Sequence, residues 1–288
     1  MMTREFYPPA AFFIDDIVKN ALQEDFGHGW DVTSQIVIPE KTHAKVQMTA
    51  RERLPVAGLI CALSVIKHID PQLTYIIHKN DGDIAEKNTS IMDISGSARS
   101  IMAAERVILN FVGHLSGIAL KTAKSVAAVK HTKAKIVCTR KTLPNLRALQ
   151  KYAVRLGGGF THRSGVDDCI LIKDNHIAVC GGIEKAVQRA RSSLGHTTKI
   201  EVECDHLGQV EEALKARADI IMLDNMSPAD LRLAVETIDG RAISEASGGI
   251  TEKTIKDIAE TGVDMISIGA LTHSAAYADV AFDFLELN

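Results

Sequence analysis

The sequence lacks a strong excess of charge of either sign. Its 288 residues carry 33 lysines and arginines against 36 aspartates and glutamates, a formal net charge of -3 at pH 7. Binding along a nucleic-acid backbone normally needs a basic surface, so we expect no nucleic-acid partner. The length suits two modest domains, or one barrel with an extension.

Long hydrophobic runs are also missing. No apolar run reaches the length that crosses a bilayer, and the first six residues, MMTREF, contain no apolar core of signal-peptide length. We therefore expect no membrane association and a cytoplasmic location.

Two common binding motifs are absent as well. The five cysteines form no CxxC pair, and neither Cys204-Asp205-His206 nor the interval from His176 to Cys180 has the spacing of a structural zinc site. We expect reduced, packed thiols. No G-x-G-x-x-G follows the first strand of the alternating region described below, so a dinucleotide site has little support.

Residues 1 to about 115 predict an α+β region. Helical spacing runs from Phe12 to Phe26, residues 29–34 are typical of a polar loop, and strands are predicted at 44–50, 73–78 and about 90–94. An amphipathic helix follows, with Ile101, Ala104, Ile108, Phe111 and Leu115 on one face. Arg106 lies off that face, and its spacing alone indicates a solvated charge.

From about residue 130, short strands alternate with helices. Alternation of this kind predicts a parallel sheet, and so many units with short loops favour a closed or nearly closed barrel, with an open doubly wound sheet as the alternative. The predicted strands are 136–138, 169–172, 200–204, 219–223, 242–244 and 265–268. The predicted helices include 183–194, 207–217, 229–238 and 252–260, with Ser227 and Thr251 as N-caps.

Cationic residues gather where two of these strands end. Arg140 and Lys141 follow the first strand, Lys173 follows the second, and a glycine-rich connection carries His162 and Arg163. Because the carboxyl ends of parallel strands meet at one edge of a sheet, the cluster predicts a pocket for a small polyanion. Taken singly, each of these residues is more readily explained as solvated surface.

Carboxylates and glycines end the later strands. Glu201 and Glu203 alternate along their strand and so point the same way. Glu203 and Asp224 together could hold Mg²⁺ through waters and substrate oxygens, although ion pairing with nearby lysines explains them nearly as well. The ends at 247–249 and 269–270 are typical of phosphate binding in the last strands of a barrel, with tight turns as the alternative.

A series of segments, in this order, resembles the quinolinate phosphoribosyltransferase family over nearly the whole chain. The segments are DVTS (31–34), ERVILN (105–110), TRKT (139–142), GGG (157–159) with His162-Arg163, LIKDNH (171–176), EVE (201–203), LDN (223–225), EASGGI (245–250) and SIG (267–269). The set in this order is highly specific.

The resemblance implies an α/β architecture. An N-terminal α+β sandwich-like domain would cover residues 1–116, an incomplete (β/α) TIM-like barrel would cover 117–272, and a C-terminal segment, 273–288, would pack back on the N-terminal domain. It also implies a homodimer with shared active sites, in which each N-terminal domain contributes to the partner's site. Assembly beyond the dimer stays open.

The resemblance further implies the reaction and the roles of residues. Quinolinate and phosphoribosyl pyrophosphate, with Mg²⁺, would give nicotinate mononucleotide, carbon dioxide and pyrophosphate for NAD synthesis. The catalytic residues would be Lys141, Lys173, Glu203 and Asp224, the last two also serving Mg²⁺ through water or substrate. The substrate-binding residues would be Arg140, His162, Arg163, Lys173, Ser247, Gly248, Gly249, Gly269, Ala270 and, from the partner subunit, Arg106. For Arg106 this replaces the interpretation as a solvated charge.

Two positions depart from the family pattern. Asn145 stands where the family commonly has glycine, and Cys138 stands where Asp or Thr is frequent. Asparagine tolerates unusual backbone angles, so we expect the turn at Asn145 to survive.

Three alternative functions remain open at this stage. A sister pentosyltransferase would use another heterocycle, which the arginine-rich cluster disfavours. A Schiff-base lyase could use Lys173 at its strand end. A catalytically idle binding protein is the third, against which the retention of every charged motif residue argues.

Overall fold

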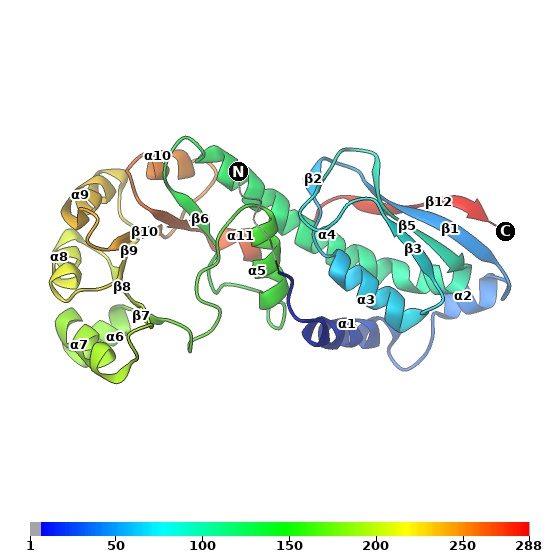
Figure 1. Ribbon diagram of the computed structural model, residues 1–288, viewed down its shortest axis with the longest axis horizontal. Helices are drawn as coiled ribbons and strands as arrows, with labels where there is room; N and C mark the ends of the chain where they lie inside the picture. Colours follow the sequence, from blue (N-terminus) through cyan, green and yellow to red (C-terminus); the bar gives the residue numbers. More distant parts are fainter. Residues whose placement is uncertain (1–6, 288) are drawn as a thin grey trace. The chain divides into compact units, whose positions relative to one another are not determined.

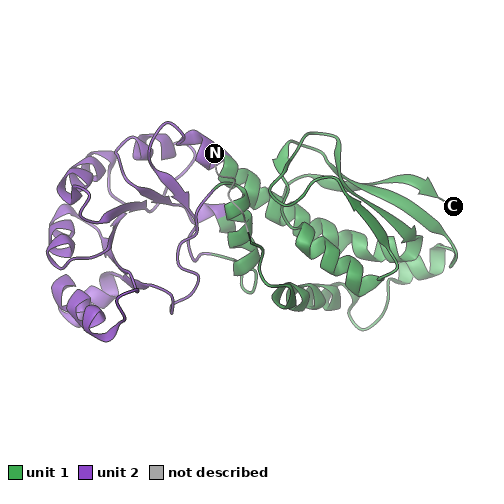
Figure 2. Ribbon diagram, in the orientation of Figure 1, with its two compact units in different colours: residues 1–123, 142–158, 272–288 green, residues 124–141, 159–271 purple. Residues whose placement is uncertain are grey.

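The computed structural model describes residues 7–287, so the predictions made for residues 1–6 and for Asn288 lie outside the described chain. It divides into two compact units (Figure 2). Unit 1 comprises residues 1–123, 142–158 and 272–288, and unit 2 comprises residues 124–141 and 159–271. The sequence-based boundary between residues 116 and 117 falls inside one continuous helix, α4 (Ala98–Ala128).

Unit 1 is built on an antiparallel sheet with strand order β12-β1-β5-β3. Its strands are β1 (His43–Ala50), β3 (Thr74–Ile77), β5 (Thr89–Ser97) and β12 (Val280–Leu287), and a short pair is formed by β2 (Leu54–Pro55) and β4 (Ile84–Ala85). Strand β12, from the C-terminal end of the chain, pairs with β1 along its length. The helices of the unit are α1 (Ala11–Phe26), α2 (Val32–Val37), α3 (Leu59–Ile69), most of α4, and α5 (Arg147–Leu156).

Unit 2 is a parallel sheet with strand order β6-β11-β10-β9-β8-β7. Figure 1 shows these strands curving into an open arc, with α7 to α10 on its outer side. The strands are β6 (Lys135–Val137), β7 (Ile170–Ile172), β8 (Ile200–Cys204), β9 (Ile220–Asp224), β10 (Ile243–Ser247) and β11 (Met265–Ser267). The helices are α6 (Asp174–Cys180), α7 (Ile183–Ser193), α8 (Leu207–Lys215), α9 (Pro228–Ile238) and α10 (Ile255–Ala259), and α11 (Ala270–His273) follows β11. The predicted α/β class with an incomplete barrel is confirmed.

Strand β8 shows how the sequence builds this sheet. Ile200, Val202 and Cys204 are fully buried, and they alternate with Glu201 and Glu203. Successive side chains of a strand point to opposite faces, so both glutamates lie on the other face of β8 from the apolar residues. The alternation therefore fixes the strand and delivers two carboxylates to the same side.

Two local predictions are wrong. Residues 32–34, predicted as loop, begin α2, because the Asp31 carboxylate accepts a hydrogen bond from the Ser34 N–H at 3.0 Å and caps the helix. Thr251 is not an N-cap, since α10 begins only after Thr254. The cap at Ser227 is confirmed, because its side chain accepts from the Asp230 N–H at 3.2 Å.

The turn at Asn145 survives the replacement of glycine, as predicted. Asn145 adopts a φ of 63°, the left-handed conformation that asparagine tolerates better than most residues. Among the described residues, no helix combines the length and the apolarity needed to cross a membrane.

Candidate active site

Unit 2 contains a cavity of about 470 Å³ where the strands of its parallel sheet end. Most of the residues singled out from the sequence line it, and they lie in or just after the ends of β6, β7, β8, β9 and β10 or in the connection before β7. The lining residues are Thr139, Arg140, Lys141, His162, Arg163, Leu171, Lys173, Glu203, Met222, Asp224, Asn225, Ser247, Gly248, Gly249 and Ser267.

Three predicted residues do not line this cavity. Arg106 is an exposed residue of α4 in unit 1. Gly269 follows β11, and Ala270 begins the short helix α11.

Arg140 and Lys141 are exposed cations that follow β6. The N–H of Lys141 donates to Thr139 Oγ1 at 3.1 Å, which shapes the turn. One residue before Thr139, the N–H of Cys138 donates to the carbonyl of Phe160 at 3.1 Å. That bond ties the end of β6 to the connection that carries His162 and Arg163, so cations separated in sequence meet at one rim.

Lys173 and Glu203 form an ion pair across the ends of β7 and β8. The Lys173 side chain is 44% exposed, whereas that of Glu203 is 12% exposed. The alternative explanation of Glu203, ion pairing with a lysine, is therefore found in this structure. A polyanion that contacts Lys173 must compete with Glu203 for the ammonium group.

The ends of β9 and β10 are fitted closely together. Asn225, at a φ of 54°, donates through Nδ2 to Asp224 Oδ2 at 2.7 Å, and its N–H donates to the Ser247 carbonyl at 2.9 Å. A Cβ on Gly248 would lie 2.2 Å from Asn225 Oδ1, so only glycine fits there. Gly249 has no such neighbour, and a Cβ on it would meet open space.

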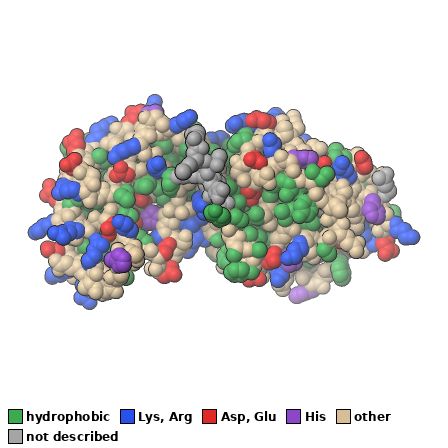
Figure 3. Space-filling view, in the orientation of Figure 1, with side chains coloured by type: hydrophobic (Ala, Val, Ile, Leu, Met, Phe, Trp, Pro, Cys, Tyr) green, Lys and Arg blue, Asp and Glu red, His purple; other side chains and the backbone are tan. Residues whose placement is uncertain are grey.

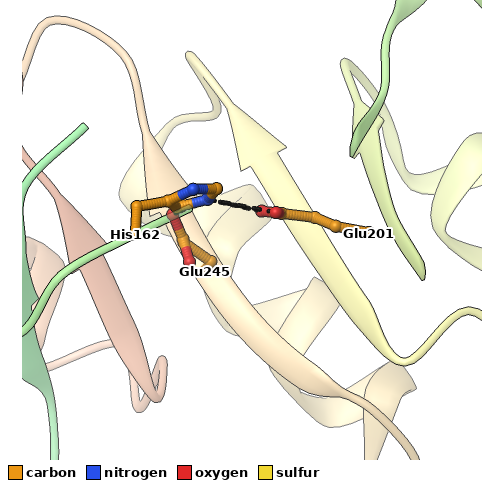
Figure 4. Close-up of side chains that lie close together, drawn as sticks. All are labelled: His162, Glu201 and Glu245. Carbon is orange, nitrogen blue, oxygen red and sulfur yellow. Dashed lines mark hydrogen bonds and ion pairs between the residues drawn. The ribbon is translucent and has the colours of Figure 1, made fainter. Parts of the chain in front are cut away.

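His162, which lines the cavity, forms a cluster with two buried glutamates behind it, Glu201 and Glu245, which do not line the cavity (Figure 4). His162 Nε2 is hydrogen-bonded to Glu201 Oε1 at 3.3 Å and lies 3.0 Å from Glu201 Oε2 and 3.5 Å from Glu245 Oε1. On the other side of the ring, the N–H of Arg163 donates to Nδ1 at 2.8 Å. The side chains are 9%, 1% and 5% exposed for His162, Glu201 and Glu245.

Burial of the carboxyl, helped by the negative charge of Glu201, raises the pKa of Glu245 to about 7. Hydrogen bonding from Ser267 and the proximity of His162 oppose this rise. The cluster thus stores a proton close to neutral pH, in a region that water barely reaches.

Two sets of residues bring metal-ligand atoms together. The ligand atoms of His162, Glu201 and Glu245 all lie within 4.8 Å of one another. Glu203 and Asp224 line the cavity with carboxylate oxygens, the donors that Mg²⁺ prefers.

Sequence reasoning missed Glu245 as a member of the site and did not pair it with Glu201. The available signal was a glutamate inside a short strand, since Glu245 lies between Ser244 and Ala246, both buried. A charge at such a position calls for a partner or a function. Asn225, Met222, Leu171 and Ser267 were likewise not predicted as lining residues.

Comparisons with known proteins agree over most of the chain. The description "Quinolinate phosphoribosyl transferase, N-terminal domain" matches residues 31–116, and that of the C-terminal domain matches residues 118–283. A probable nicotinate-nucleotide pyrophosphorylase (carboxylating) of Methanocaldococcus jannaschii is 43% identical over 278 residues, covering 93% of this chain and 96% of that protein. The nicotinate-nucleotide pyrophosphorylase (carboxylating) of Mycobacterium leprae is 40% identical over 273 residues, covering 93% and 96%. A solved nicotinate-nucleotide pyrophosphorylase of Francisella tularensis superposes with a TM-score of 0.93 at 38% identity, covering 99% of this chain and 100% of that one.

Proposed function

The chain belongs to the quinolinate phosphoribosyltransferase family, and from that premise we propose that it converts quinolinate and phosphoribosyl pyrophosphate to nicotinate mononucleotide, carbon dioxide and pyrophosphate. The reaction supplies NAD synthesis. The observation that carries the proposal for this chain is the convergence of Arg140, Arg163 and Lys173 on one cavity at the strand ends.

Arg140, Arg163 and Lys173 bind the two adjacent carboxylates of quinolinate in this proposal. Guanidinium groups form planar forks that match carboxylates bidentately, and their charge does not titrate away near neutral pH. Lys173 leaves Glu203 for the substrate, which exchanges one charged partner for another. Both ring nitrogens of His162 already bind protein groups, Glu201 and the Arg163 N–H. His162 therefore acts in this proposal by holding the main chain of Arg163.

The phosphoribosyl donor occupies the opposite part of the cavity. Lys141 neutralises its phosphate oxygens, and Ser247, Gly248 and Gly249 offer a hydroxyl and backbone N–H groups to them. Gly269 and Ala270, at the end of β11, extend this phosphate-binding set. The close contact of Gly248 with Asn225 keeps this turn in one conformation.

The donor set suits Mg²⁺, because Glu203 and Asp224 present hard carboxylate oxygens beside the proposed position of the pyrophosphate. These two residues would hold the ion through water or substrate oxygens. When bound, the ion neutralises negative charge on the leaving pyrophosphate.

Catalysis rests on positioning and electrostatics, without a covalent enzyme intermediate. The ring nitrogen of quinolinate forms a bond to the ribose carbon as the bond to pyrophosphate breaks. A carboxylate of the Glu203 and Asp224 pair stabilises the positive charge that develops on the ribose. The carboxylate beside the ring nitrogen then leaves as carbon dioxide, the electron pair of the broken carbon–carbon bond stays on that ring carbon beside the positive nitrogen, and the carbon takes up a proton.

A homodimer completes the site in this proposal, with Arg106 of each protomer serving the partner's cavity. Its support is that Arg106 is exposed on α4 and lines no part of the cavity of unit 2. Unit 1 also exposes large apolar side chains, with Phe12 at 74%, Trp30 at 77% and Ile36 at 77%, and Figure 3 shows hydrophobic side chains gathered around α1 and α3. A cytoplasmic location belongs to the same proposal, and cell fractionation tests it.

Mixing two inactive variants tests the shared site. In a C2 dimer, randomly reassembled Arg106→Ala and Arg140→Ala protomers regain about a quarter of the wild-type sites, since half of the dimers carry one intact site. Recovery of activity on mixing is the expected result. No recovery, with heterodimers demonstrated by a tag, would contradict the shared site.

Turnover tests the reaction. Purified protein with quinolinate, phosphoribosyl pyrophosphate and Mg²⁺ should give nicotinate mononucleotide and carbon dioxide in equal amounts, and nicotinate in place of quinolinate should give none. Absence of both products would overturn the proposed function. Borohydride treatment with substrate is expected to leave Lys173 unmodified, because the proposed reaction forms no Schiff base. In a Schiff-base lyase, borohydride would instead attach the substrate covalently to Lys173.

A further inference from the structure

His162 has no ring nitrogen left to offer a substrate in this arrangement. Nε2 faces Glu201 and Glu245, Nδ1 accepts from the Arg163 N–H at 2.8 Å, and the side chain is only 9% exposed. A residue so enclosed can act on a bound anion only through its neighbours.

The hydrogen bond from the Arg163 N–H determines the tautomer of His162. A backbone N–H can only donate, so Nδ1 must accept with its lone pair, and the ring hydrogen must sit on Nε2. That hydrogen points at the carboxylate of Glu201, whose two oxygens lie 3.0 and 3.3 Å away. Figure 4 shows the imidazole edge facing Glu201, with Glu245 beside it.

The same bond argues for a proton rather than a metal ion between the three side chains. Their ligand atoms lie within 4.8 Å of one another, as a metal site requires. A metal on Nε2 would take the lone pair of that nitrogen and force the ring hydrogen onto Nδ1. Nδ1 would then meet the Arg163 N–H donor to donor, at a distance of 2.8 Å.

Burying the two carboxylates costs free energy, and the histidine that compensates this cost also contacts Arg163. Glu201 is 1% and Glu245 5% exposed, and neither Oε2 of Glu201 nor Oε1 of Glu245 has a hydrogen-bond partner among the described residues. Two adjacent buried carboxylates destabilise a fold unless a proton and a donor compensate them. Here the donor is Nε2–H of His162. The other ring nitrogen, Nδ1, accepts a hydrogen bond from the N–H of Arg163, which lines the cavity.

We infer that Glu201 and Glu245 are positioning residues, which hold His162 as the Nε2–H tautomer so that Nδ1 fixes the main chain of Arg163 and presents its guanidinium to the dicarboxylate. The inference rests on the proposed function for the identity of that substrate. It concerns quinolinate recognition, because the hydrogen bond of His162 Nδ1 ends on Arg163, which is proposed to bind quinolinate and not the phosphoribosyl donor.

Spectroscopy on the wild-type protein tests the tautomer without any turnover. In a two-bond proton–nitrogen correlation spectrum of ¹⁵N-histidine-labelled protein, His162 should show the pattern of the Nε2–H form at neutral pH. Loss of this signal in His162→Asn identifies it. The Nδ1–H pattern, or that of a doubly protonated ring, would overturn the inference even if the enzyme turns over quinolinate as proposed.

Two amide replacements at His162 separate positioning from direct contact. The Oδ1 of His162→Asn can replace Nδ1 as the acceptor for Arg163, whereas the amide of His162→Gln reaches only the position of Nε2. The KM for quinolinate should therefore be roughly fivefold lower in His162→Asn than in His162→Gln, a ratio that corresponds to the contribution of about one hydrogen bond. A lower quinolinate KM for Gln than for Asn would overturn the inference.

Glu201 provides the matched kinetic test. Glu201→Leu should raise the KM for quinolinate roughly tenfold and change that for phosphoribosyl pyrophosphate by less than about twofold, whereas Glu201→Gln, which keeps an acceptor for Nε2–H, should recover most of the loss. Glu211→Gln, on the exposed face of α8, serves as the control. Equal increases in both KM values, or no rescue by Gln, would overturn the inference. If the Leu variant does not fold, the pair of amide replacements at His162 decides.

Discussion

Asp81 in unit 1 and Glu245 in unit 2 are enclosed carboxylates, each with one oxygen that has no hydrogen-bond partner among the described residues, and they differ in their neighbours. In unit 1, Asp81 accepts the N–H of Leu59 at 2.9 Å, at the start of α3, and its Oδ2 is fully enclosed. In unit 2, Glu245 faces a second carboxylate, Glu201, and a histidine nitrogen at 3.5 Å, which is too long for a normal hydrogen bond.

Burial raises both pKa values, that of Asp81 to about 6 and that of Glu245 to about 7. For Asp81, the backbone N–H groups of residues 58–60 and the Tyr152 hydroxyl oppose the rise by binding the charged form. For Glu245, the neighbouring Glu201 adds to it. Donors from the backbone mark Asp81 as part of the fold, whereas the contact with His162, which lines the cavity, connects Glu245 to the site.

The largest effect should come from the cations that are proposed to bind quinolinate. Arg140→Ala should lower kcat/KM for quinolinate by about 10²-fold and leave the free energy of unfolding unchanged, since the variant loses charge-assisted bonds to the substrate only. Steady-state kinetics and urea denaturation measure the two quantities. Arg232→Ala, on exposed α9, is the control. An Arg140→Ala variant with full turnover would remove the carboxylate assignment.

Asp81→Ala should show the reverse pattern. The replacement leaves the enclosed N–H of Leu59 without its acceptor, so we expect a loss of about 2 kcal/mol in the free energy of unfolding. The kcat of the folded protein should not change, because Asp81 lies in unit 1 and lines no part of the cavity. Asp81→Asn keeps an acceptor and should lose less than half as much. A fall in kcat for either variant would break the contrast between the two carboxylates.

The contrast also shows how far the sequence alone reaches. Strand β8 was predicted with its observed bounds, because apolar and acidic residues alternate from Ile200 to Cys204. The cations at the strand ends were also predicted, because the position of a residue within a βα unit decides which edge of the sheet it reaches. Helix α2 was missed because its β-branched residues favour other conformations and its start depends on the single cap Asp31.

The pairing of Glu201 with Glu245 could not be read from the sequence. The two residues lie on β8 and β10, which are separated by β9 in the sheet, and their approach depends on the curvature of that sheet. No residue next to either glutamate in the sequence indicates that the two side chains meet. The same is true of Asp81, whose partner Tyr152 lies on α5. Contacts that the folded sheet or helix packing creates leave no periodic signal.

Glu245→Gln should change how stability depends on pH. The folded pKa of Glu245, about 7, lies above the usual value for glutamate, so between about pH 4.5 and pH 7 the native state holds a proton that the unfolded state has lost. The free energy of unfolding of the wild type should therefore fall as the pH rises through this window. Glutamine cannot ionise, and the free energy of unfolding of the variant should rise relative to that of the wild type by on the order of 3 kcal/mol across this window. Parallel pH profiles of the two proteins in urea denaturation would contradict a protonated Glu245.

Tyr152→Phe should give the smallest effect and the finest comparison. The Tyr152 hydroxyl lowers the pKa of Asp81 by hydrogen bonding to its charged form, so its removal should raise that pKa further above about 6. At pH 8, where Asp81 is ionised, the variant should lose about 1 kcal/mol of unfolding free energy, and the loss should shrink below pH 6 as Asp81 takes up its proton. Urea denaturation at the two pH values, with wild type beside the variant, measures the difference. A loss independent of pH would mean that Tyr152 stabilises unit 1 by packing alone, and that Asp81 depends only on backbone donors.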